Sequence, residues 1–246
     1  MDIRVVLVDV NSKVVAAWRS TFEENPEVEV VSGSMLDQRV DAWVTPTNAR
    51  ASMDGGLDAV IKNHLGKGIE KRVQAEVRRL HGGLLPVGKA VCVPTGSGRP
   101  SFLISTPTMM GSSEDISDSL NVAAACAAAF QAVHMQNDRE PGSIGSVALP
   151  GLGAQTGRVP VEICADLMWT GYTLFRRRVL FADFAEMRAA LEAELGPLGT
   201  SATFPGSPKS KAKSEGGPSP TTSAPASAAS NGHPAGPPAD EDFDDF

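Results

Sequence analysis

The stretch VDAWVTPTNARASMDGGLDAVI, residues 40–61, and its later counterpart VALPGLGAQTGRVP, residues 147–160, decide the fold of this chain. Each is an apolar run that ends in a loop of glycine and small polar residues. Glycine lets backbone N–H groups approach an anionic ligand because no Cβ intervenes, and a helix that begins just after such a loop adds its positive end. Two loops of this kind on parallel strands would form one cleft at the carboxyl ends of those strands. The sequence therefore predicts a cleft suited to a diphosphate.

Around these segments, strand-like and helix-like patterns alternate with short turns. The run at residues 3–8 is apolar apart from Arg4, which is typical of a strand covered on both faces of its sheet. Alternation of this kind favours a three-layer α/β/α fold. We expect strands at residues 3–8, 28–31, 42–44, 91–93, 103–106 and 147–149, and helices at 14–25, 57–65, 69–80, 116–136, 161–175 and 184–195.

Composition narrows the classes of function. The chain has 246 residues, 41% of them hydrophobic, and a net charge of −7, which argues against strong non-specific nucleic-acid binding. No apolar run approaches the ~18 residues of a membrane span, and we expect a cytoplasmic protein. The four histidines do not cluster, so we predict no metal and no cofactor; the three cysteines are expected to be buried thiols (His64, His81, His134, His233; Cys92, Cys126, Cys164).

The composition changes sharply after Leu198. Residues 199–239 are rich in Ser, Pro, Ala, Gly and Thr, and residues 240–246 form an acidic tip that contains Phe243 and ends in Phe246. A segment with so few apolar residues cannot offset its ordering entropy. We predict a folded domain over residues 1–198 and a disordered tail over residues 199–246.

Four motifs in order resemble those of the macro domain, a module that binds ADP-ribose. That family has a strand reading roughly V-D-A-I-V-N-A-A-N that runs into a glycine-rich loop and V-D-x-A-I; here residues 40–48 lead into residues 54–61. Residues 85–91 and 102–106 resemble the next two strand entries of the family, and residues 151–160 resemble its second loop. The resemblance covers roughly residues 1–195 and implies a mixed central sheet.

The resemblance also implies roles for single residues. Asn48 would hold the distal ribose, although an Asx-turn that satisfies its own loop is the structural alternative. Asp58 would activate a water near the anomeric carbon, although it could simply stabilise a helix N-terminus; Asp54 competes for the same role, and we favour Asp58. The predicted catalytic residues are Asn48 and Asp58, and the predicted ligand-binding residues are Ser34, Met35, Asn48, Asp54, Gly55, Gly56, Gly151, Gly153, Ala154, Gln155, Thr156 and Gly157.

Three positions depart from the family pattern. The Gly-Asp that usually follows the second strand is Gly33-Ser34 here, and the first Asn of the Asn-Ala-Ala-Asn run is Thr45. An aromatic residue that often packs beside the distal ribose is Thr156. These departures fit a divergent bacterial or phage-type branch.

The sequence leaves three functions open. The first is a domain that binds ADP-ribose or a related nucleotide diphosphate and hydrolyses ADP-ribosyl esters. The second is a non-catalytic reader of ADP-ribosylated macromolecules, and the third is a scaffold protein that acts through its tail. Residues 240–246 resemble the acidic tip of bacterial single-stranded-DNA-binding proteins, so Phe243 and Phe246 predict a docking tip for a protein partner; a solubilising acidic end is the alternative.

Overall fold

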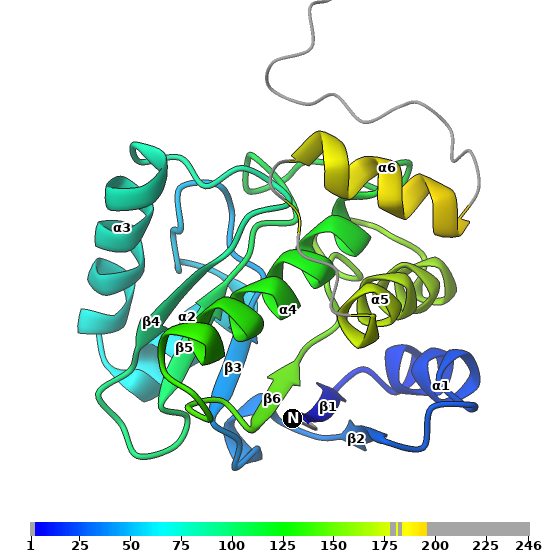
Figure 1. Cartoon of the computed structure of the whole chain (residues 1–246), viewed down its shortest axis with the longest axis horizontal. Helices are drawn as coiled ribbons and strands as arrows, with labels where there is room; N and C mark the ends of the chain where they lie inside the picture. The colour runs from blue at the N-terminus through cyan, green and yellow to red at the C-terminus, as the bar shows by residue number, and fades with distance from the viewer. Residues whose placement is uncertain (1–2, 178–180, 182–183, 196–246) are drawn as a thin grey trace, which may run out of the picture. The chain divides into compact units, whose positions relative to one another are not determined.

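The computed structural model describes residues 3–177, 181 and 184–195 (Figure 1). The strands are β1 (Arg4–Asp9), β2 (Val28–Ser32), β3 (Ala42–Thr45), β4 (Val91–Pro94), β5 (Phe102–Ser105) and β6 (Ser146–Leu149). The helices are α1 (Ser12–Thr21), α2 (Gly56–Leu65), α3 (Gly68–His81), α4 (Asn121–Arg139), α5 (Val161–Arg176) and α6 (Phe184–Leu195), with a short 3-10 helix η1 (Met35–Asp37) after β2.

The six strands form one mixed sheet in the order β2-β1-β6-β3-β5-β4. All neighbouring strands are parallel except β4, which runs antiparallel to β5. β6 lies between β1 and β3, so the two glycine-containing loops follow adjacent parallel strands, as the sequence predicts. The loops that follow five parallel strands therefore meet at one edge of the sheet.

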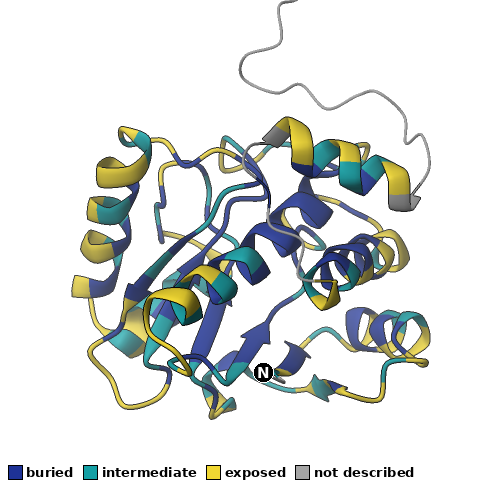
Figure 2. Cartoon of the chain, in the orientation of Figure 1, coloured by how far each residue is buried: buried dark blue, intermediate teal, exposed yellow. Residues whose placement is uncertain are grey.

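Helices cover both faces of the sheet, which confirms the predicted three-layer α/β/α fold (Figure 1). Side chains along β1 alternate between the layers. Val5 and Leu7 pack in the core with α1, α4, α5 and α6, whereas Val6 and Val8 pack in the core with α2 and α3. The strands and much of α4 are accordingly buried in Figure 2.

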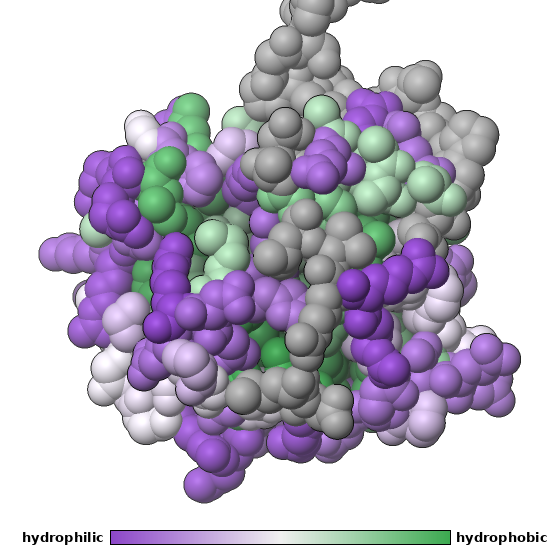
Figure 3. Space-filling model, in the orientation of Figure 1, coloured by the Kyte–Doolittle hydropathy of each residue, from purple (hydrophilic) through white to green (hydrophobic). Residues whose placement is uncertain are grey.

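α3 is amphipathic, with one apolar face toward the sheet and one polar face toward the solvent. Ile69, Val73 and Val77 are buried against the sheet, while the positions between them are charged or polar apart from Ala75. Figure 3 shows hydrophilic side chains over most of the visible surface of α3. This spacing of apolar residues is the one that the sequence pattern predicts for a surface helix.

The predicted helix over residues 116–136 is wrong at its start, because α4 begins at Asn121. Before that residue, side chains bond to nearby backbone and hold a turn instead. The Ser117 amide donates to Asp115 Oδ1, and the Ser119 hydroxyl donates to the Ile116 carbonyl. Such local bonds compete with helix formation. The other predicted elements are present, with ends shifted by a few residues at most.

Cys126 and Cys164 are buried and Cys92 is half-buried, and none forms a disulfide. Within the described residues, no helix has the length and apolar character needed to cross a membrane. The predicted boundary at residue 198, the disordered tail and the tip at Phe243 and Phe246 lie outside the described residues and stay predictions.

Candidate ligand-binding site

A cavity of about 710 Å³ lies where the parallel strands end. Its wall takes residues from the loops after β1, β2, β3, β5 and β6, together with the start of α2. The lining residues are Val8, Asp9, Val10, Gly33, Ser34, Met35, Pro46, Asn48, Ser52, Asp54, Gly55, Gly56, Leu57, Asp58, Val60, Thr108, Met109, Ser112, Gly151, Gly153, Gln155, Thr156 and Gly157. Eleven of the twelve predicted ligand-binding residues are among them, and Ala154 is not.

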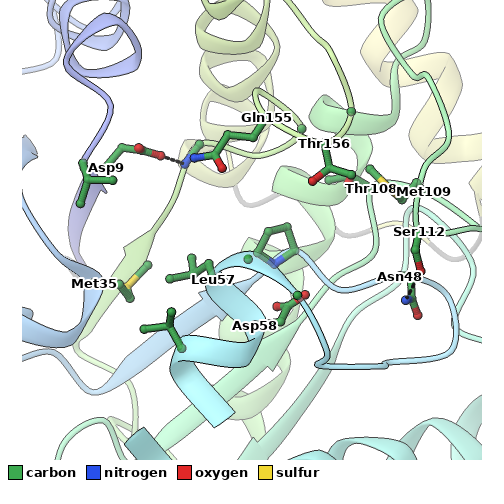
Figure 4. Close-up of a pocket in the computed structure, with 18 of the residues that line it drawn as sticks. Asp9, Met35, Asn48, Leu57, Asp58, Thr108, Met109, Ser112, Gln155 and Thr156 are labelled. Atoms are coloured by element: carbon green, nitrogen blue, oxygen red, sulfur yellow. Dashed lines mark hydrogen bonds between the residues drawn. The ribbon is translucent and has the colours of Figure 1, made fainter. Parts of the chain in front are cut away.

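The two glycine-containing loops lie on opposite sides of this cavity (Figure 4). Asn48 and Asp58 lie on the side of the first loop, and Gln155 and Thr156 lie across from them on the second. Met35 and Leu57 lie at the end nearer to β2 and give it an apolar lining. The end near β2 therefore combines these apolar side chains with the Asp9 carboxylate, whereas Asn48 and Asp58 make the other end polar.

The second loop needs its glycines for packing. A Cβ on Gly151 would lie 2.9 Å from Asp9 Oδ2, and one on Gly153, which has a φ of +76°, would lie 2.9 Å from Val122. A Cβ on Gly157 would lie 2.7 Å from the carbonyl oxygen of Gly153. Protein atoms already occupy the space that a Cβ would need at these three positions, so the glycines would be required even in a loop that binds no ligand.

The backbone amides of the second loop give the ligand-binding interpretation independent support. The Gly151 amide donates to Asp9 Oδ2 at 3.1 Å. The following amides from Gly153 to Gly157 donate to no acceptor among the described residues. A series of free amides beside a cavity favours an anionic ligand.

The first loop has glycines of another kind. No atom lies within 4 Å of a Cβ built on Gly55 or on Gly56, and both residues line the cavity. α2 begins at Gly56 with no side-chain cap, and among the described residues no acceptor takes the amides of Gly56, Leu57 and Asp58. The positive end of α2 therefore faces the same cavity as the second loop.

Asp58, in the first turn of α2, has an unusual environment. Burial raises the pKa of its carboxyl to about 6, and the nearby charge of Glu70 acts in the same direction. A hydrogen bond from the Thr45 hydroxyl and the charge of Lys62 oppose this rise. A carboxyl that titrates near neutral pH in a cavity is suited to accept and return a proton.

Asp54, the competing carboxylate, has the opposite character. Its side chain is 72% exposed, and its carboxylate accepts hydrogen bonds from the Lys62 ammonium at 2.9 Å and from the Ser52 hydroxyl. These bonds hold its pKa below the ordinary value. An exposed, ion-paired carboxylate is a poor general base, which supports the preference for Asp58.

Asn48 follows β3, and its side chain forms hydrogen bonds within its own loop. Its Oδ1 accepts hydrogen bonds from the amides of Arg50 at 3.0 Å and Ser52 at 3.3 Å, and its Nδ2 donates to Ser112 Oγ at 3.2 Å. The structural alternative weighed for Asn48 is therefore present. The residue also lines the cavity, so a contact with a ribose remains a prediction.

The remaining predicted residues differ in how they are held. The Ser34 hydroxyl caps η1 by accepting from the Leu36 amide at 3.1 Å, and Met35 is buried. Gln155 and Thr156 are exposed at the cavity wall, and Ala154 is half-buried. Their contacts with a ligand stay predictions.

Sequence reasoning missed several lining residues, above all Asp9, Thr108 and Ser112. Asp9 ends β1 and holds Gly151 in place, as described above. Its position at the end of an apolar strand was a usable signal. Thr108 and Ser112 follow β5 in a segment without a glycine-rich pattern, and only the strand order brings them to the cavity.

Comparison with known proteins places this geometry in a family. A family model described as "Macro domain" matches residues 44–168. An uncharacterized protein of Aquifex aeolicus (strain VF5) is 33% identical over 179 residues, which are 69% of this chain and 98% of that protein.

Two solved structures are similar in fold. The macrodomain of Mycobacterium tuberculosis DarG has a TM-score of 0.49 and 23% identity, over 60% of this chain and 89% of that one. The Thermosipho africanus DarTG structure in complex with ADP-ribose has a TM-score of 0.47 and 19% identity, over 58% of this chain and 38% of that one. The family match, which spans half of the chain, shows that this chain belongs to the macro domain family.

Proposed function

We propose that this domain binds ADP-ribose or a related nucleotide diphosphate in the cavity at the carboxyl ends of the strands. Macro domains bind ADP-ribose. The observation that carries the proposal for this chain is the set of unpartnered amides, residues 153–157 on one side and residues 56–58 on the other, around one cavity in the described part of the chain. Both sets leave N–H groups available as donors to a diphosphate.

The size and lining of the cavity support the same class of ligand. A volume of about 710 Å³ lies within the range of small-molecule sites. The end near β2, with Met35 and Leu57, suits a flat base, and the polar end, with Asn48 and Asp58, suits a sugar. A ligand with a base, a diphosphate and a second ribose would match these surfaces in that order.

Isothermal titration of the full chain with ADP-ribose, ADP and NAD tests this proposal. We expect ADP-ribose to bind with one-site stoichiometry, and ADP more weakly because it leaves the polar end unfilled. If none of the three produces a saturable heat, the ligand-binding proposal is wrong and a scaffold role for the chain gains support.

We also propose that the domain hydrolyses ADP-ribosyl esters, with Asp58 as the general base and Asn48 positioning the ribose. The observation that favours turnover is the half-buried Asp58 carboxyl at the cavity wall, whose pKa is raised to about 6. Asp58 would take a proton from water as the water oxygen bonds to the anomeric carbon. The bond from that carbon to the ester oxygen breaks, and the released carboxylate leaves with its electron pair.

Release of ADP-ribose from an ADP-ribosylated glutamate peptide, followed by chromatography, tests this step. Turnover that depends on Asp58 supports hydrolysis. Tight binding without turnover would instead identify a non-catalytic reader of ADP-ribosylated macromolecules.

A further inference from the structure

Lys62 joins the two helices beside the first loop. It lies one turn after Asp58 on α2, and its Nζ is 2.9 Å from Asp54 Oδ1 and 3.2 Å from Glu70 Oε2 on α3. The side chains of Lys62 and Glu70 are only 17% and 21% exposed. Charges so far withdrawn from water are less screened than those of surface pairs.

Glu70 also holds the loop backbone. While Oε2 pairs with Lys62, Oε1 accepts a hydrogen bond from the Met53 amide at 2.7 Å. Asp54, the next residue, is held by Lys62 and by the Ser52 hydroxyl. Glu70 and Lys62 therefore bind two consecutive residues of the loop, Met53 and Asp54 respectively.

The glycine end of this loop has few contacts of its own. The open space around Gly55 and Gly56 and the lack of a side-chain cap on α2 leave their position to be set by the segment before them. That segment, residues 52–54, is the one that Lys62 and Glu70 hold. Ser52, Asp54, Gly55 and Gly56 all line the cavity, whereas Lys62 and Glu70 do not.

We propose that Lys62 and Glu70 form an ionic clamp that fixes the loop of residues 52–56 in its binding position and so sets the affinity of the cavity for its ligand. Both act as positioning residues, because neither lines the cavity and their hydrogen bonds go to residues 53 and 54 of the loop; their charges also act on the pKa of Asp58. A loop held in place before binding loses less conformational entropy when the ligand arrives. The inference rests on the proposed function for the identity of that ligand, ADP-ribose.

The test compares three variants of the full chain. Lys62→Met removes the charge and keeps an unbranched stem, and Lys62→Arg restores a cation. Arg79→Met is the matched control, because it removes the same charge from an ion pair with Glu76 that lies within α3 and does not reach the loop. Hydrogen exchange at the Met53 amide reports the clamp without any ligand, and titration with ADP-ribose reports affinity.

We expect Lys62→Met to speed exchange at Met53 and to weaken ADP-ribose binding by about tenfold, and Arg79→Met to change neither property. Lys62→Arg should restore much of both properties. Unchanged Met53 exchange in Lys62→Met would overturn the clamp, and faster exchange with unchanged affinity would overturn its positioning role. If wild-type protein binds no ADP-ribose, the proposed function fails, and the exchange data alone still decide whether the clamp exists.

Discussion

Two opposing demands meet at the Asp58 carboxyl. As a base it must be ionised, yet burial at the cavity wall raises its pKa to about 6 and makes ionisation costly in the folded state. Thr45, the fully buried last residue of β3, offsets part of that cost by donating a hydrogen bond. A carboxylate that destabilises its own fold at neutral pH is more easily explained by function than by structure.

Replacing Asp58 with Asn should separate its role as a general base from the cost of its ionisation to folding. Ester hydrolysis should fall by about 10²-fold, the scale of a lost general base, while ADP-ribose still binds. Kinetics and titration on the same preparation measure the two effects. An Asp58→Asn protein with full turnover would remove Asp58 from the catalytic role.

The same variant should be more stable than wild type in alkaline buffer. The pKa of Asp58 is raised in the folded protein, from 3.8 to about 6, so its ionisation opposes folding; the stability present below pH 3.8 is lost as pH rises through about 6. Melting curves should therefore show the gain from the Asp58→Asn substitution growing between about pH 4 and pH 6 and reaching at most about 3 kcal/mol above that. A gain that is equal at about pH 4 and pH 8 would contradict the raised pKa.

Thr45→Val keeps the shape of the buried side chain and removes its hydroxyl. Without this donor the ionised form of Asp58 loses support, so the pKa of Asp58 should rise above its wild-type value. Thr45→Ser should bring the pKa back. Titration of the Asp58 carboxyl carbon by NMR measures the change, and identical curves for Thr45→Val and wild type would show that the hydrogen bond is absent in solution.

At the scale of loops, the glycines have two different reasons to be glycine. Those of the second loop have no room for a Cβ, because Asp9, Val122 and neighbouring backbone already fill the space. Those of the first loop have open space on the cavity side. A side chain should thus harm the fold in the second loop and harm only ligand binding at Gly55, whereas at Gly56 the φ of +53° would also strain the backbone.

Alanine substitutions test this distinction. Gly55→Ala should leave the melting temperature unchanged and weaken ADP-ribose binding by about ten- to a hundredfold, because its Cβ would enter the space of the ligand. Gly98→Ala, also in open space but away from the cavity, is the matched control and should change neither property. Gly157→Ala should lose about 1–3 kcal/mol of stability. Equal binding by the Gly55 and Gly98 variants would argue against a ligand over the first loop.

The sequence predicts these elements well where local pattern decides them. Apolar runs that end in glycine predict β3, β6 and both loops, and helical spacing predicts α3 and α5. The prediction is wrong for the segment before α4, because Asp115 and Ser119 form local side-chain bonds that apolar periodicity does not reveal. The sequence also does not reveal why a given position must be glycine. A Cβ on Gly153 would collide with Val122 in the core, so packing alone already requires this glycine.

At the scale of the whole domain, the order of the strands determines which loops meet at the cavity. The sequence alone could pair the loops after β3 and β6, because both carry glycine. It could not bring in Thr108 or Ser112, whose segment carries no glycine-rich pattern, until the order β2-β1-β6-β3-β5-β4 sets the strands side by side. The hydrogen bond from Thr45 to Asp58 likewise becomes visible only when α2 packs beside the end of β3.

The central claim, that the free amides around this cavity receive a diphosphate, is tested most directly by titrating the full wild-type chain with ADP-ribose while following its melting temperature. A ligand specific for the native state adds about 2.7 kcal/mol of stability at about a hundred times its dissociation constant. We predict a saturable one-site heat and a melting temperature that rises with ligand concentration. No heat of binding, together with an unmoved melting curve at millimolar ADP-ribose, would contradict the account.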